Sequence, residues 1–230
     1  MDRLLAGFRN TFEGKAYLHR NSTLGDAIAS LLYEDMWALG KSISFKQRVS
    51  AREVAVNTRN QISGKVGRRG DGTLGELVPG APTSEETGFQ VSRGPVAALQ
   101  VGAEVKIIAT KMTAQFDRVM NDLKGQAQTF RDHGKAVLTV GMVGVNFAEA
   151  YTGYEGVRQF EAKSPPSRSA AEIVRRLEEK VLPFYDEFLI LRFKASNRLP
   201  FDFEWVDELR TREHYASIVL RLSNAYEGRF

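Results

Sequence analysis

The run Val96-Ala-Ala-Leu-Gln-Val-Gly-Ala-Glu-Val-Lys-Ile-Ile-Ala109 is rich in Val, Ile and Ala, which predicts a long β-strand. A helical pattern follows over residues 111–132, with its apolar positions on one face. A second run, 135–147, is nearly continuous in apolar residues and glycine, as expected of a buried strand. Strand, helix and strand in this order predict a right-handed βαβ crossover and therefore an α/β fold.

Weaker patterns extend this unit in both directions. Towards the N-terminus we expect a short amphipathic helix over 3–18, a helix over 23–39, a short strand over 73–78 and a polar connection over 79–94. Towards the C-terminus we expect a helix over 170–180, a strand over 188–193 and a helix over 212–226. The length of 230 residues fits one domain over 1–230.

The composition excludes some chemistry. The chain has no cysteine, so it holds no disulfide, no thiolate metal site and no cysteine nucleophile. Residues 1–10 lack the apolar segment of a secretory signal, and the apolar run 135–150 is too short and too rich in glycine to span a membrane. These features lead us to expect a cytoplasmic protein. The net charge of +4 permits an anionic partner without requiring one.

Positive charge is concentrated in residues 40–70. Eight basic residues face a single acid there, Glu53; they are Lys41, Lys46, Arg48, Arg52, Arg59, Lys65, Arg68 and Arg69. Such a stretch is typical of contacts to nucleic-acid phosphates, whose affinity falls with salt. The alternative is a surface connection that these residues keep soluble.

The strand over 96–109 carries an acid and a base in otherwise apolar surroundings. Because side chains alternate along a strand, Glu104 and Lys106 share one face, with Gln100 below them. A buried charge is costly unless it is paired or binds a metal. One reading is a salt bridge on the wet face of an edge strand. The other reading is a catalytic site.

Hydrolysis of a phosphodiester suits this pair. A carboxylate binds Mg²⁺ through oxygen, and a lysine orients or deprotonates the attacking water or stabilises the developing charge. One carboxylate is too few for Mg²⁺, so we expect a second acid from a neighbouring element. Asp71 is the first candidate because it lies in a glycine-flanked loop just before the strand over 73–78, and its alternative role is that of a turn former.

Asp71, the Glu104-Val105-Lys106 element and the helix and strand that follow it together resemble the PD-(D/E)XK nuclease superfamily. The segments Leu24-Gly-Asp-Ala-Ile-Ala29, Arg68-Arg-Gly-Asp-Gly72 and Gly102-Ala-Glu-Val-Lys106 are similar to a group of bacterial restriction-type proteins. The resemblance implies a restriction-endonuclease-like core over about 23–147, a central mixed β-sheet flanked by helices, with a C-terminal elaboration over about 165–230. One departure is that Gly70, and not proline, precedes Asp71.

The resemblance also implies roles for individual residues. Asp71, Glu104 and Lys106 are the expected catalytic residues, with Asp71 and Glu104 on Mg²⁺, for which Mn²⁺ can substitute. Further candidates for a metal-binding acid are Glu34, on the first core helix, and Glu76, on the adjacent strand; a solvated helix face is the plainer reading of Glu34. The residues expected to contact DNA are Arg59, Lys65, Arg68, Arg69 and Gln115.

The function expected from these features is that of a Mg²⁺-dependent endonuclease of the type II restriction class, acting on double-stranded DNA in the bacterial cytoplasm. Palindromic targets suit two-fold symmetry, so we expect a homodimer. Two alternatives remain: a repair or RNA nuclease of the same fold, and a nucleic-acid-binding module that does not cleave.

Overall fold

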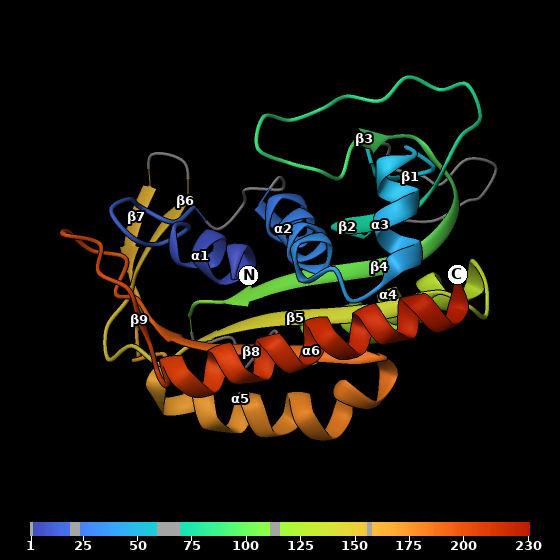
Figure 1. Ribbon diagram of the computed structural model, residues 1–230. Helices are drawn as coiled ribbons and strands as arrows, with labels where there is room; N and C mark the ends of the chain where they lie inside the picture. Colours follow the sequence, from blue (N-terminus) through green and yellow to red (C-terminus); the bar gives the residue numbers. More distant parts are fainter. Residues whose placement is uncertain (1, 19–23, 59–69, 111–115, 156–157) are drawn as a thin grey trace.

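The protein is an α/β structure built on a mixed sheet of seven strands in the order β3-β1-β2-β4-β5-β8-β9 (Figure 1). The computed structural model describes residues 2–18, 24–58, 70–110, 116–155 and 158–230. The strands are β1 (Val54–Asn57), β2 (Gly72–Leu77), β3 (Arg93–Gly94), β4 (Val96–Ile108), β5 (Leu138–Asn146), β6 (Thr152–Glu155), β7 (Arg158–Glu161), β8 (Glu187–Lys194) and β9 (Glu204–Trp205).

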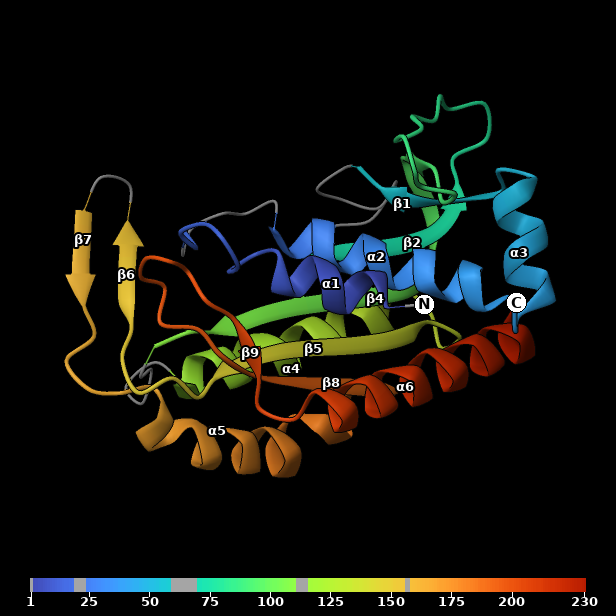
Figure 2. The same cartoon turned by 60° about the vertical axis from the view of Figure 1, so that its left-hand side comes forward.

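Helices cover both faces of the sheet, as Figure 2 shows for α2 and α5 on its opposite sides. They are α1 (Arg3–Arg9), α2 (Leu24–Leu39), α3 (Ile43–Ser50), α4 (Phe116–Asp132), α5 (Ser167–Lys180), the 3-10 turn η1 (Leu182–Phe184) and α6 (Glu208–Arg229). The larger hydrophobic core joins α1, α2, α3 and α6 to one face, and the second core joins α4 and α5 to the other. No helix in the described part of the chain combines the length and the apolar character needed to cross a bilayer.

The predicted strand–helix–strand unit is confirmed. β4 and β5 pair in parallel, with Glu104 opposite Gly141 and Lys106 opposite Val143, and α4 connects the two strands. β4 also pairs with β2 in the antiparallel sense, and β5 pairs in parallel with β8. The sheet is therefore mixed, and its helix-flanked form is consistent with the core that the sequence led us to expect.

The predicted alternation along β4 holds except at Gln100. Val101, Ala103 and Val105 belong to the core on the α2 side, which leaves Glu104 and Lys106 on the α4 side. The side chain of Gln100 instead hydrogen-bonds Tyr226 of α6 and does not lie below Glu104. The reason is a β-bulge: the partners of consecutive β2 residues jump from Val101 to Leu99, and the extra residue changes face.

Several elements differ from the prediction. The first helix ends at Arg9, well short of residue 18, and a series of turns follows it. The basic stretch contains a helix and a strand, α3 and β1, which its charged sequence concealed. The β6–β7 hairpin forms a separate two-stranded sheet at one end of the molecule (Figure 2).

Candidate active site

The candidate site lies at a step in the sheet, where β2 begins beside a strand that continues past it. The first residue of β2, Gly72, pairs with Ala103, whereas β4 runs on to Ile108. Beyond Ala103, β4 therefore has no β2 neighbour on that side. Asp71, the residue directly before β2, occupies this step.

Asp71 takes over the hydrogen bonding that a strand would supply there. Its Oδ2 accepts a hydrogen bond from the backbone N–H of Val105 at 2.9 Å. The backbone of Asp71 in turn donates to the carboxylate of Glu104. The two acids that the sequence singled out, 33 positions apart, are thus neighbours on adjacent strands.

Glu104 and Lys106 form a salt bridge on the α4 face of the sheet. The side chain of Glu104 is 8% exposed and that of Lys106 is 34% exposed, so the ammonium group is the part of the pair that solvent reaches. Strand alternation brings the two side chains to the same face, two residues apart. An acid this buried needs a partner, and Lys106 is one.

The Glu104 carboxyl is nonetheless poorly stabilised as an anion. Burial, and then the negative charge of Asp71, raise its pKa to about 7 from an ordinary value of 4.5. Lys106 and the Asp71 backbone act in the opposite direction but do not cancel that rise. Two carboxylates so close in a buried site repel each other, and a cation between them would relieve the repulsion.

The Lys106 amine is held in its charged form. Burial lowers its pKa, but the charge and hydrogen bond of Glu104 and the charges of Asp71 and Asp122 outweigh burial, so the pKa ends above its ordinary value. At neutral pH Lys106 is therefore an ammonium group. It is suited to donate hydrogen bonds and to stabilise negative charge, and less suited to accept a proton.

Two glycines allow neighbouring elements to approach Asp71 closely. A Cβ on Gly25, in the first turn of α2, would lie 2.5 Å from Cγ of Asp71. Gly70 has φ of +74°, and a Cβ there would lie 2.4 Å from the ring of Phe130 in α4. Gly70, which stands before Asp71 in place of the expected proline, thus allows a left-handed backbone conformation in contact with an aromatic ring.

Comparison with known proteins identifies no relative. No family model matches the chain, and no curated protein or solved structure matches it either. The chemistry of the site is therefore the basis on which a function is assigned.

The sequence reasoning missed the groups that α4 and the short segment between η1 and β8 bring to the site. Burial, followed by the charges of Glu104 and Asp71, raises the pKa of Tyr185, whose hydroxyl donates to the Leu123 carbonyl at 2.7 Å. The negative charge of Asp122, in α4, is among the charges that raise the pKa of Lys106. Neither residue has a motif spacing that would single it out, because both come from elements that only the fold brings near β4.

Glu34 is placed away from this site and is a structural residue. Its side chain is 1% exposed, and one oxygen accepts from the backbone N–H groups of Gln90 and Val91 at 2.9 and 2.8 Å. The other oxygen pairs with Arg3 at 3.1 Å. Glu34 also lies about 13 Å along α2 from Gly25, the residue that touches Asp71. Neither the proposed metal role nor a solvated helix face describes it.

Glu76 also lies apart from Glu104. It is opposite Ala98, at the far end of β2, about 17 Å along the strand from Asp71. Its carboxylate pairs with Arg48 at 2.9 Å. Two ligands of one Mg²⁺ must each lie about 2 Å from the ion, so Glu76 cannot share an ion with Glu104. Asp71, and not Glu76, is the acid beside Glu104.

The residues expected to contact DNA lie outside the described part of the chain. They are Arg59, Lys65, Arg68, Arg69 and Gln115. Two other basic residues of the stretch are engaged in ion pairs, Arg48 with Glu76 and Arg52 with Glu85. Lys46 lies over the ring of Trp37. The described half of the stretch therefore stabilises the fold at these three positions.

The donor set fits Mg²⁺. This ion prefers oxygen ligands, keeps several waters, and is commonly held by one or two carboxylates together with substrate phosphates. Asp71 and Glu104 supply two carboxylates, and burial followed by their repulsion raises the pKa of Glu104. Within the described residues, no group of three or more His, Cys, Asp or Glu side chains is arranged to hold a metal.

Proposed function

We propose that this chain is a Mg²⁺-dependent endonuclease of the PD-(D/E)XK type that hydrolyses DNA, and that it acts as a restriction enzyme. The observation that carries the proposal is the convergence of Asp71, Glu104 and Lys106 at the step between β2 and β4. Two repelling carboxylates beside a charged amine in a partly buried site suit a metal ion and a phosphate.

Asp71 and Glu104 would hold the ion. When bound, Mg²⁺ supplies positive charge and Lewis acidity next to the scissile phosphate. The carboxylate of Asp71 is fixed in place by the N–H of Val105, so its position is set before any ligand arrives. Glu104 must lose its proton to take part, and its pKa of about 7 makes that loss easy at the pH of the cell.

Lys106 acts on the phosphate or on the attacking water as a hydrogen-bond donor. Its raised pKa keeps it protonated, which favours stabilisation of the negative charge that develops on the phosphate over removal of a proton from water. Its partial exposure leaves the ammonium group within reach of a substrate. The proton of the attacking water then leaves to solvent or to a phosphate oxygen.

The proposal assigns DNA contacts to the basic residues that directly precede Asp71 in the sequence. Arg68 and Arg69 are three and two residues, respectively, before the proposed metal-binding acid. Phosphate contacts position the duplex without reading its bases. The same proposal includes a homodimer, because one site cuts one strand and a duplex has two.

The test is cleavage of supercoiled plasmid DNA by the purified protein with Mg²⁺, compared with the same reaction in EDTA. We expect discrete fragments with Mg²⁺ and none with EDTA. Lys106→Ala should lower the rate by ~10²–10³, the usual cost of removing one group that stabilises the transition state, and should still bind DNA. The matched control is Lys194→Ala, a half-exposed lysine of β8 that pairs with Glu204; its rate should be unchanged.

The other outcomes separate the alternatives. DNA binding without cleavage, in either Mg²⁺ or Mn²⁺, would favour a non-catalytic binding module. A smear in place of discrete bands would favour a repair nuclease, and cleavage of RNA alone would favour an RNA nuclease. Full activity of the Lys106→Ala variant would remove this lysine from the mechanism.

A further inference from the structure

The sheet has an open edge along most of β8. On its outer side β8 is followed only by β9, which pairs with Phe193 and Lys194. A further hydrogen bond, which the N–H of Val206 donates to the carbonyl of Arg192 at 3.0 Å, occupies the edge at Arg192. Before Arg192, no strand in the described part of the chain lies next to β8 on this side.

The direction of the backbone groups along this edge follows from alternation. Arg192 directs its carbonyl outward to Val206, whereas Phe193 directs its carbonyl inward to the N–H of Phe147. Residues two apart in a strand face the same way, so Phe188 and Ile190 direct their N–H and C=O groups outward as Arg192 does. Among the described residues, no backbone group pairs with these four outward groups. Such an edge is a template for another strand.

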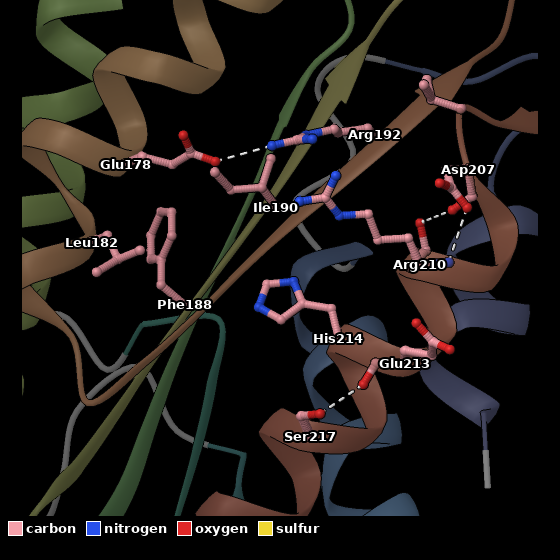
Figure 3. A pocket seen from close by; sticks show the side chains of 12 residues that line it. Glu178, Leu182, Phe188, Ile190, Arg192, Asp207, Arg210, Glu213, His214 and Ser217 are labelled. Carbon is pink, nitrogen blue, oxygen red and sulfur yellow. Dashed lines mark hydrogen bonds and ion pairs between the residues drawn. The ribbon is translucent and has the colours of Figure 1, made fainter.

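A groove runs along the same edge between α5 and α6 (Figure 3). Its volume is about 580 Å³. Phe188, Ile190 and Leu182 lie on one side of it, and Arg210 and His214 of α6 extend over it from the other (Figure 3). The edge is therefore accessible and bordered by apolar side chains, the setting in which a sheet accepts an added strand.

The two ends of the open edge carry matching apolar side chains. Leu182, which precedes β8, is 43% exposed, and Val206, at the level of Arg192, is 41% exposed. A second exposed apolar residue lies two or three positions further along the sequence at each end, Phe184 at the first and Leu209 at the second. An antiparallel two-fold pairing of β8 with another β8 brings the first end of one chain against the second end of the other.

Charges of both signs line the groove. Its arginines are Arg192 and Arg210, and its acids are Glu178, Asp207 and Glu213. Burial, followed by the charge of Arg221, lowers the pKa of His214, so this side chain carries little positive charge at neutral pH. Arg192 is already paired with Glu178 at 3.0 Å. Because the groove carries charges of both signs, it offers no uniformly positive surface to a strongly charged partner such as a nucleic acid. A second copy of this chain carries the same mixture of charges and can complement it.

We propose that a second copy of this chain docks at the β8 edge and continues the sheet across a two-fold axis. Val206 occupies the position next to Arg192, so the added strand fits only beside the residues before it. An axis at Leu189 satisfies this limit and pairs Phe188 of each chain with Ile190 of the other, making four main-chain hydrogen bonds. The apolar ends, Leu182 and Val206, then face each other across the axis.

The test is sedimentation equilibrium of the full chain without DNA or metal, over a range of concentrations. We expect a monomer–dimer equilibrium that Leu182→Lys and Val206→Glu each weaken at least tenfold. The variant that carries both changes places opposite charges against each other across the axis and should recover most of the association. Ile43→Lys, at an exposed apolar position on α3, is the control and should leave the equilibrium unchanged.

Hydrogen exchange tests the backbone pairing itself. The amides of Phe188 and Ile190 should exchange fast at low concentration and become protected as the dimer forms, and Leu182→Lys should abolish that protection. A chain that stays monomeric at the highest concentration, or a dimer that none of the β8-edge variants weakens, would overturn the proposal. Neither readout involves cleavage, so a failure here leaves the proposed nuclease activity standing, and the reverse is also true.

Discussion

The strands β2 and β4 carry an acid near a base at each of their two ends, and the two ends differ in kind. At one end Glu76 pairs with Arg48, and both are in turn near Gln100 and Tyr226. The Glu76 side chain is half exposed, and Arg48 also pairs with the still more exposed Glu53 at 3.5 Å. At the other end two acids, Asp71 and Glu104, share one lysine in a mostly buried site.

Burial is what separates the two ends. Acids that pair with an arginine near solvent need nothing further, and such pairs contribute little to stability. At the Asp71 end, burial and then the negative charge of Asp71 raise the pKa of Glu104 to about 7. Unfavourable electrostatics that the rest of the fold maintains are typical of functional sites. We therefore place the proposed function at the buried end of the two strands.

The largest expected effect comes from neutralising one acid at each end. Glu104→Gln should reduce the cleavage rate on the order of 10³, because it removes a carboxylate on which the ion depends. Glu76→Gln, the matched change at the exposed end, should stay within about twofold of the wild type, because a half-exposed ion pair contributes little. Plasmid cleavage at fixed Mg²⁺ measures both. Equal losses in the two variants would erase the distinction between the ends.

A smaller effect is expected from Gly25→Ala. Alanine is the better helix former by about 1 kcal/mol, so α2 itself should gain stability. The added Cβ would lie 2.5 Å from the Asp71 carboxyl carbon and would displace the carboxylate, which we expect to slow cleavage about 10²-fold. Rates and thermal unfolding of the variant separate the two effects.

The control for that change is Gly125→Ala. Gly125 is also a helical glycine, in α4, and a Cβ there would have no atom within 4 Å. It should gain stability and keep its activity. If Gly25→Ala were as active as Gly125→Ala, the Asp71 carboxylate would not need its present position.

The smallest expected effect is on stability. The folded chain raises the pKa of Glu104 from 4.5 to about 7, so it retains a proton that the unfolded chain releases. This group therefore favours folding most below pH 4.5, and its penalty grows as the pH rises to about 7 and is complete above it. Without metal, Glu104→Gln should stabilise the protein by roughly 1–3 kcal/mol more at pH 8 than at pH 4. Urea unfolding at the two values measures this, and a gain that did not change with pH would contradict it.

Periodicity was enough to predict the central part of the fold. The strand–helix–strand unit, the helix before it and the last helix are all present, because their apolar positions repeat at the spacing of the element. The helix α3 and the strand β1 were missed, because Arg48 and its neighbours make that segment look like a charged connection. Burial of Phe45 and Val49 of α3 and Val54 of β1 in the larger core folds this segment, and such long-range packing is invisible in one stretch of sequence.

The candidate site was predicted in part. Alternation along β4 placed Glu104 and Lys106 on one face, and the structure brings Asp71 next to them. Glu34, which was considered for a metal role, holds a loop against α2 through the N–H groups of Gln90 and Val91. Gly25 and Tyr185 were missed, because their importance depends on distances between elements that the sequence does not contain.

The central claim is that Asp71 and Glu104 together bind a divalent cation. Soaking crystals of the protein in Mn²⁺ and measuring anomalous scattering tests it most directly, because the peak identifies the ligands without reference to activity. We predict a peak between the Asp71 and Glu104 carboxylates that is lost in crystals of Glu104→Gln. A well-ordered site without a peak, or a peak at Glu76 or Glu34 in its place, would contradict the account.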